Sequence, residues 1–141
     1  MPRRRGRLEA GEAGRVITVE TENRSGVEVG ESEVVALARR VLAAEGVEDG
    51  ELGIAFVAAD EMRGLKREHL GIDEATDVLS FPLDGRDELP DGVPRALGDV
   101  VLCPEVVGDE WRRPLVHGLL HLLGYDHGSE MESREHEHAA T

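Results

Sequence analysis

The chain has 141 residues, enough to bury one hydrophobic core but too few for two independent domains. Thirty acidic residues against sixteen basic ones give a formal net charge of −14, which excludes a protein that coats nucleic acid by bulk attraction, and we expect no DNA partner. The single cysteine, Cys103, excludes intramolecular disulfides and a thiolate metal cluster, and we expect it to be a buried small hydrophobe.

Residues 1–14 are rich in Arg, Gly and Glu and show no apolar periodicity, so we predict a disordered tail there and a single domain over residues 15–141. No stretch approaches the roughly 18 to 20 apolar residues of a membrane helix. The start of the chain also lacks the apolar run of a signal peptide. We therefore expect a cytoplasmic protein without a membrane partner.

The first half of the chain alternates between strand and helix patterns. Val16–Val19 is β-branched throughout and predicts a strand, and apolar residues at helical spacing predict a helix over residues 34–42 with Ser32 as its N-cap. Alternating apolar residues over 52–56 predict a second strand. Asp60 then follows as the predicted cap of a short helix.

The second half predicts two strands and a strongly apolar helix. Val78–Phe81 and Leu97–Cys103 are typical of strands, and they are separated by a loop rich in Asp, Gly and Pro. Pro114 suits the first turn of a helix that is apolar nearly all round, and a weaker helix is expected around Met131. We expect His138 near the end of the chain to be exposed. This element order predicts an α+β fold, a small mixed β-sheet with helices packed against it.

Three histidines near the end of the chain have the spacing of a metal site. His117 and His121 stand four apart, which on a helix places both imidazoles on one face. Gly124 permits a left-handed turn, so that His127 can approach the same point from outside the helix. Burying two imidazoles among leucines is costly unless they are paired or metallated. The pattern therefore predicts one zinc ion bound by His117, His121 and His127.

Three imidazoles without a fourth protein ligand indicate a catalytic site, because such zinc sites keep one position for water or substrate. Imidazole also favours zinc over magnesium or calcium, which prefer oxygen ligands. The spacing His-x3-His-x2-Gly-x2-His equals that of metzincin peptidases, but Gly118 stands where those enzymes carry a catalytic Glu. A zinc-dependent peptidase-like hydrolase is therefore an alternative hypothesis rather than the main one.

Three blocks of the sequence resemble the YbeY family of bacterial endoribonucleases. They are Thr76-Asp-Val-Leu-Ser-Phe-Pro82, Leu97-Gly-Asp-Val100 and His117-Gly-Leu-Leu-His-Leu-Leu-Gly-Tyr-Asp-His127, in the family's order. The resemblance implies an α+β fold with zinc on the three histidines. It also implies a single-strand-specific endoribonuclease that acts in ribosomal RNA maturation, at the 3′ end of the small-subunit RNA, and in ribosome quality control.

The chemistry that this resemblance implies is hydrolysis of an RNA phosphodiester, for which a metal ion lowers the pKa of a water and offsets charge on phosphate oxygens. Arg63, Lys66 and Arg67 on one short helix are the candidates for phosphate contacts. A merely solvated helix face explains these three residues equally well. Asp126 is either an orienter of His127 or a turn residue that faces water. The sequence assigns no general base.

The chain departs from the family pattern at a position that bears on activity. Leu70 stands where many members carry an Arg ahead of the Thr-Asp-Val-Leu-Ser-Phe block. The stretch between Cys103 and His117 and the C-terminal helix are also short for the family. A third hypothesis therefore stands beside ribonuclease and peptidase, a catalytically degenerate zinc protein that associates with ribosomes.

Overall fold

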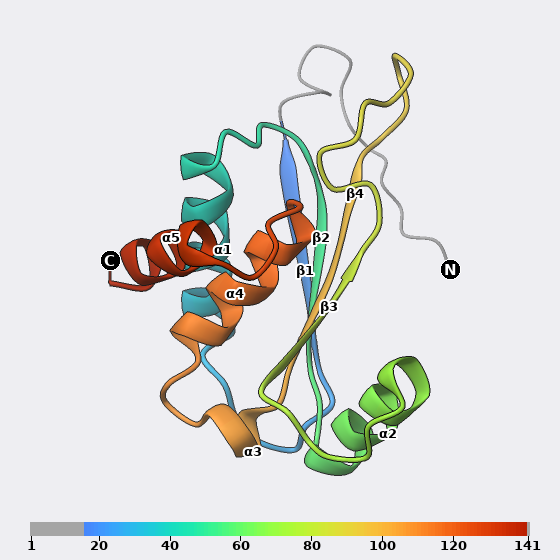
Figure 1. The fold of residues 1–141 in the computed structure, drawn as a ribbon, viewed down its shortest axis with the longest axis vertical. Coiled ribbons are helices and arrows are strands. Elements are labelled where there is room, and N and C mark those ends of the chain that lie inside the picture. Colours follow the sequence, from blue (N-terminus) through green and yellow to red (C-terminus); the bar gives the residue numbers. More distant parts are fainter. Residues whose placement is uncertain (1–15, 141) are drawn as a thin grey trace.

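The computed structural model describes residues 16–140, which form a four-stranded mixed sheet with helices on both faces (Figure 1). The strands are β1 (Ile17–Asn23), β2 (Gly50–Phe56), β3 (Val78–Pro82) and β4 (Ala96–Leu102). The helices are α1 (Glu31–Ala44), α2 (Ala59–Leu70), α3 (Pro104–Val107), α4 (Arg112–Leu122) and α5 (Ser129–Ala139). The predicted α+β class is confirmed, while the tail predicted over residues 1–14 lies outside the described residues.

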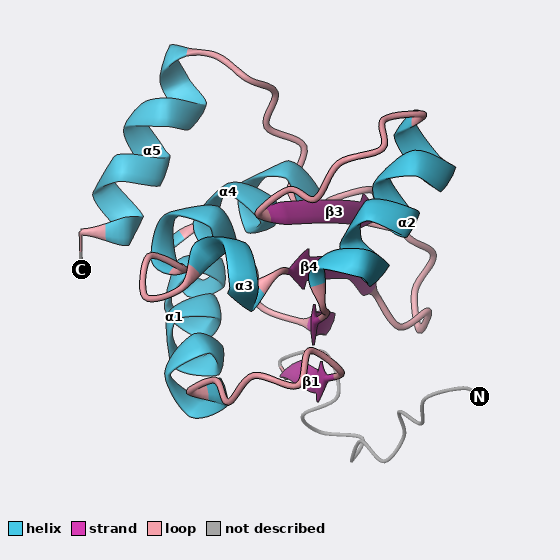
Figure 2. Cartoon of the chain, turned by 90° about the horizontal axis from the view of Figure 1, so that it is seen from below, coloured by secondary structure: helices cyan, strands magenta, loops and turns pink. Residues whose placement is uncertain are grey.

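The strand order is β1-β2-β4-β3, with β1, β2 and β4 parallel and β3 antiparallel to β4. Strand β3 is therefore an edge of the sheet, and helix α4 packs over β3 and β4. Helices α1, α4 and α5 cover one face, whereas α2 lies on the other (Figures 1 and 2). None of the helices over residues 16–140 is long and apolar enough to cross a membrane.

The main core lies between the sheet and helices α1 and α4, because the side chains of each strand alternate between its two faces. In β2 the buried Leu52, Ile54 and Phe56 alternate with less buried residues, as the sequence pattern predicts. The end of strand β4 is buried on both faces, since Val100 and Leu102 lie in the main core and Val101 packs in a second, smaller core beneath α2. Cys103 belongs to this second core and is fully buried, which confirms its expected packing role.

Both predicted helix caps are wrong. The N-cap of α1 is Gly30 and that of α2 is Ala58, so Ser32 and Asp60 lie inside their helices. At α2 the Ala59 N–H instead donates to the Glu105 carboxylate at 2.7 Å. Glu105 belongs to the short helix α3, which the sequence pattern did not indicate. A tertiary contact thus replaces the local cap, because a carboxylate from elsewhere in the chain satisfies the free N–H.

Candidate metal centre

Helix α4 presents His117 and His121 beside the edge strand β3, while its apolar residues pack into the core. The helix ends in a Schellman motif, in which the Gly124 N–H donates to the His121 carbonyl at 3.0 Å and the Tyr125 N–H to the Leu120 carbonyl at 3.1 Å. Gly124 has a φ of 98°, a left-handed conformation that glycine adopts without strain. The turn carries His127 back towards the helix, as the sequence predicts.

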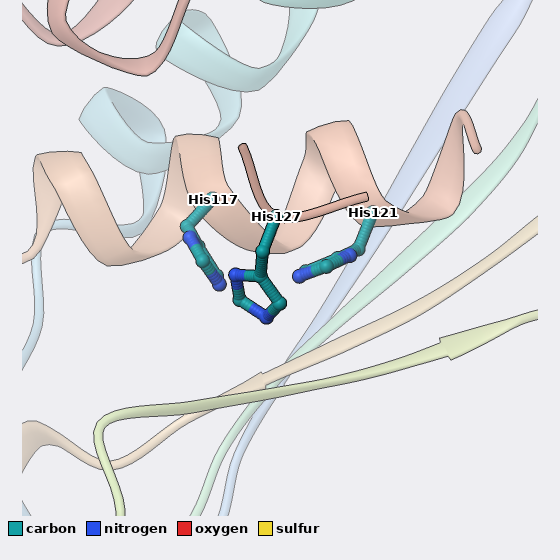
Figure 3. A group of neighbouring side chains, drawn as sticks. All are labelled: His117, His121 and His127. Atoms are coloured by element: carbon teal, nitrogen blue, oxygen red, sulfur yellow. The ribbon is translucent and has the colours of Figure 1, made fainter. Parts of the chain in front are cut away.

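The three imidazoles converge on one point below α4 (Figure 3). Their ring centroids are 4.7 Å apart for His117 and His121, 4.7 Å for His121 and His127, and 5.3 Å for His117 and His127. One nitrogen from each ring lies within 4.8 Å of the nitrogens of the other two, so the group could hold a metal ion. His117 and His121 are half-buried, and His127 is exposed.

Hydrogen bonds to Nδ1 select the tautomer of two of the rings. His117 Nδ1 lies 2.6 Å from a Glu135 carboxylate oxygen, and His121 Nδ1 lies 3.0 Å from the Tyr125 carbonyl oxygen. An ionised carboxylate and a carbonyl only accept, so both Nδ1 atoms carry the hydrogen. In its neutral form each ring therefore has its unprotonated nitrogen at Nε2, which is the atom that can bind a divalent ion.

The electrostatic surroundings favour a neutral His121. Burial lowers the pKa of His121, and the neighbouring His117 and His127 lower it further. The Tyr125 carbonyl and Asp126 oppose this shift, but the pKa stays below its ordinary value. Because a histidine must be neutral to bind a metal, His121 is ready for coordination near neutral pH.

Glu135 connects the histidine triad to a cation. This buried carboxylate accepts a hydrogen bond from Arg113 Nε at 2.8 Å through one oxygen and contacts His117 through the other. Glu135 lies on α5 and both partners lie on α4, so the contact joins the two helices. A carboxylate partner of this kind orients a ligand imidazole and raises its basicity.

A second buried carboxylate, Glu45, reaches the site through Tyr125. The Tyr125 hydroxyl donates to Glu45 Oε1 at 2.8 Å, and the carbonyl of the same residue accepts from His121. Glu45 Oε2 also accepts from Arg134 at 3.0 Å and pairs with His138 Nε2 at 2.7 Å. The expectation that His138 is an exposed bystander is therefore wrong, since its side chain is only 14% exposed.

Two adjoining cavities meet at His117. One, of about 500 Å³, is lined among others by Asp77, Arg113 and Glu135. The other, of about 470 Å³, contains all three histidines together with residues of β3 and the turn after α4. His117 and Val78 line both cavities, so together they form a groove along the edge strand β3.

The three basic residues predicted to bind RNA lie on α2 and form ion pairs. Arg63 and Arg67 contact Asp73 at 3.4 and 3.1 Å, and Lys66 lies 3.5 Å from Glu74. None of these three side chains is among the described residues that line the two cavities. Helix α2 nevertheless ends at Leu70, which lines the cavity that contains the histidines.

The carboxylates that orient the triad were not identified from the sequence. Asp126 lines the triad cavity but is exposed, whereas Glu135 and the Tyr125 carbonyl contact the rings of His117 and His121. Glu135 and Glu45 lie 18 and 93 positions from partners that they meet through folding. Glu135 lies four positions after the buried Met131 on α5, but acidic residues are common in this polar helix, so this spacing did not single it out.

Comparison with known proteins agrees with this arrangement. The family model described as Endoribonuclease YbeY matches residues 18–140. Relatives named Endoribonuclease YbeY include that of Beutenbergia cavernae, 43% identical over 84% of this chain and 89% of its own, and that of Mycobacterium ulcerans, 38% identical over 84% and 76%. A solution structure from Thermotoga maritima has a similar fold, with a TM-score of 0.55 and 23% identity over 86% of this chain and 87% of that one.

The matched region includes strands β3 and β4, the three histidines and helix α5, whose Glu135 contacts His117. Because the family match covers nearly all of the described residues, and relatives above 30% identity cover most of the chain, the chain belongs to the YbeY family of endoribonucleases.

Proposed function

We propose that this chain is a zinc-dependent endoribonuclease that cleaves single-stranded RNA. We also propose that it acts in the cytoplasm, in maturation of the small-subunit ribosomal RNA 3′ end and in ribosome quality control, with ribosomal RNA or the ribosome as its partner. One zinc ion would be held by His117, His121 and His127 within a single domain over residues 15–141. The observation that carries the proposal is the convergence of three imidazoles on a groove in a chain of an endoribonuclease family.

The three histidines fit zinc, because neutral imidazole nitrogens bind zinc better than they bind magnesium or calcium. The Glu135 and Tyr125 contacts support this assignment, since they leave Nε2 of His117 and His121 free to coordinate. When bound, the ion supplies a Lewis acid that activates water and offsets negative charge on phosphate oxygens. The protein itself positions the ligands and shapes the groove that receives the substrate.

The shape of the groove favours a single strand. Its two cavities lie side by side along β3, where unpaired bases or sugars can be accommodated on either side of His117. Single-stranded RNA can splay its bases into such cavities, whereas a duplex keeps them stacked and paired. We therefore propose that the phosphodiester to be cut crosses the groove at the histidine triad.

Arg63, Lys66 and Arg67 are proposed to contact phosphates that flank the groove, because their helix ends at Leu70 in the groove wall. Their ion pairs with the loop after α2 would exchange for contacts with RNA. Ion pairs with exposed partners contribute little to stability, so this exchange costs little. Such contacts predict cleavage that weakens as the salt concentration rises.

Metal analysis combined with an RNA assay tests the proposed function. The purified full chain should contain one zinc ion and cut a labelled single-stranded RNA while sparing the same sequence in a duplex. Treatment with EDTA should abolish cleavage. His117→Ala should lose both zinc and cleavage because a ligand is missing. His136→Ala is the matched control, since that histidine is exposed on α5, outside the triad.

Each other outcome identifies a different function. A chain with stoichiometric zinc that cuts no RNA would be the catalytically degenerate relative, with Leu70 as the first residue to restore to Arg. Cleavage of casein without cleavage of RNA would indicate the peptidase-like hydrolase. RNA cleavage that persists in EDTA and in His117→Ala would show that a contaminating nuclease is responsible.

A further inference from the structure

Arg113 lies in the groove beside the histidine triad. It lines the cavity beside His117 and is the one Lys or Arg among the described residues that line either cavity of the groove. Its side chain is 54% exposed, so the guanidinium remains accessible to solvent while one nitrogen is anchored. This position differs from that of the basic residues on α2, which lie outside both cavities.

Glu135 holds Arg113 at a defined place relative to the histidine triad. One carboxylate oxygen accepts from Arg113 Nε at 2.8 Å, and the other lies 2.6 Å from His117 Nδ1. The two side chains are thus bound to opposite oxygens of the same buried group. Only Nε of the guanidinium is used in this contact, which leaves its two terminal amino groups to donate elsewhere.

The charge of the cavity requires such a cation if a polyanion is to enter. Asp77, Glu110 and Glu135 also line this cavity, and the whole chain carries a net charge of −14. A phosphate approaching these carboxylates is repelled unless a positive group faces it. A guanidinium whose amino groups form a planar fork is well suited to that task, because the fork matches two phosphate oxygens.

We propose that Arg113 binds the RNA phosphate next to the cleavage point and is a substrate-binding residue of the groove. This inference rests on the proposed ribonuclease function. In this proposal the Arg113 guanidinium allows an acidic cavity to accept a phosphodiester. Glu135 then orients both His117 and the Arg113 guanidinium.

Arg112 provides a matched control for this proposal. It is the preceding residue of α4 and carries the same charge, but its guanidinium stacks on the Trp111 ring at 4.5 Å and it lines neither cavity. Removing either charge changes the net charge of the chain equally. A difference in kcat/KM between Arg112→Gln and Arg113→Gln therefore shows the effect of the position of Arg113 in the groove.

The experiment compares wild type, Arg112→Gln, Arg113→Gln and Arg113→Lys as zinc-loaded full chains. Zinc content, melting temperature, and kcat and KM on a labelled single-stranded RNA are measured over a range of salt concentrations. Arg113→Gln should lower kcat/KM by about 10- to 100-fold, as expected for a hydrogen bond to a charged group. It should also flatten the slope of log kcat/KM against log salt by about 0.7, one phosphate contact. Zinc content should be unchanged.

Arg113→Lys separates charge from geometry. Lysine restores the positive charge without the fork, so the salt slope should return while kcat/KM recovers only in part. Arg112→Gln should stay within about threefold of wild type in kcat/KM, because an exposed charge outside the groove is screened.

Two results would overturn the inference. Equal effects of Arg112→Gln and Arg113→Gln would mean that Arg113 acts only through overall charge. A loss of zinc in Arg113→Gln with normal activity per bound zinc would mean that Arg113 merely neutralises Glu135. Failure of the proposed function is recognised separately in the wild-type arm, where no RNA would be cut, and it removes the inference with it.

Discussion

Glu45 and Glu135 are the buried acidic side chains in the part of the chain that the structure describes, and both connect to the histidine triad. A buried carboxylate is costly unless hydrogen bonds and opposite charge compensate it. Glu135 is compensated by Arg113 and contacts His117, and Glu45 is compensated by several donors that include Tyr125. Glu135 contacts His117 directly, and Glu45 reaches His121 through Tyr125, so both carboxylates help to position the histidine triad.

Removing Glu135 should weaken metal binding. Glu135→Ala deletes the acceptor that fixes His117 Nδ1, so zinc affinity should fall by about 10- to 100-fold. Competition with a chromophoric chelator measures the affinity, and the visible spectrum of the cobalt-substituted protein reports ligand geometry. Glu132→Ala on the exposed side of the same helix should bind zinc as the wild type does. Equal affinities for the two variants would contradict a positioning role for Glu135.

At the scale of single elements, the close packing of α4 on the sheet decides where the histidines lie. A Cβ added at Gly118 would lie 2.9 Å from Val100 Cγ1 and 3.1 Å from both Ser80 Oγ and Val78 Cγ2. Gly118 therefore faces the sheet. The glutamate that metzincins carry at the matching place in the pattern has no room at this position, which removes the structural basis for the peptidase mechanism.

Two glycine-to-alanine variants test this packing. Gly118→Ala should lower the free energy of unfolding by about 1–3 kcal/mol, because the added methyl group forces α4 away from β3 and β4. Gly64→Ala in α2 should instead raise it by up to about 1 kcal/mol, since among the described side chains its added Cβ would meet just the end of Arg67, at 4.0 Å. Urea denaturation measures both. A Gly118→Ala variant at least as stable as the wild type would mean that the contact at Gly118 is not tight.

For the molecule as a whole, Glu45 joins segments that are far apart in the sequence. The end of α1 meets Arg86 in the β3–β4 loop, Tyr125 after α4, and Arg134 and His138 on α5. Burial alone would raise the pKa of Glu45, but the hydrogen bonds from His138, Tyr125 and Arg134 outweigh burial and lower it. A carboxyl whose pKa is lower in the folded state stabilises the fold above its unfolded pKa and loses that contribution as the pH falls through its folded pKa.

Replacing Glu45 should therefore change stability in a pH-dependent way. Glu45→Gln should unfold about 1–3 kcal/mol more easily than the wild type at pH 7, because it loses charged hydrogen bonds. The difference should shrink as the pH falls from the ordinary Glu value of about 4.5 through the lower pKa of the folded state, where the wild-type carboxyl becomes neutral like the Gln amide. Denaturation curves from pH 3 to 7 measure it, with the exposed Glu88→Gln as control. A difference that does not change with pH would show that the Glu45 charge contributes nothing.

The sequence by itself predicted the order of the strands and of every helix except α3, the α+β class and the triad, because each depends on local periodicity. Four-residue spacing on a helix and a glycine turn bring His117, His121 and His127 together without help from distant residues. The same local reasoning placed Leu52, Ile54 and Phe56 correctly on one face of β2. The family resemblance rests on those segments too, and the family match confirms it.

Only the tertiary structure decided what surrounds the triad. Glu105 replaces the predicted cap at α2, Glu135 and Glu45 reach their partners across the fold, and Arg113 enters the groove while Arg63 and Arg67 do not. A buried carboxylate looks like any surface acid in the sequence, since its burial depends on which helix packs over it. The convergence of the three histidines is set by spacing along one helix and its turn, whereas the orientation of their rings and the charge of the groove are set by contacts between elements distant in the chain.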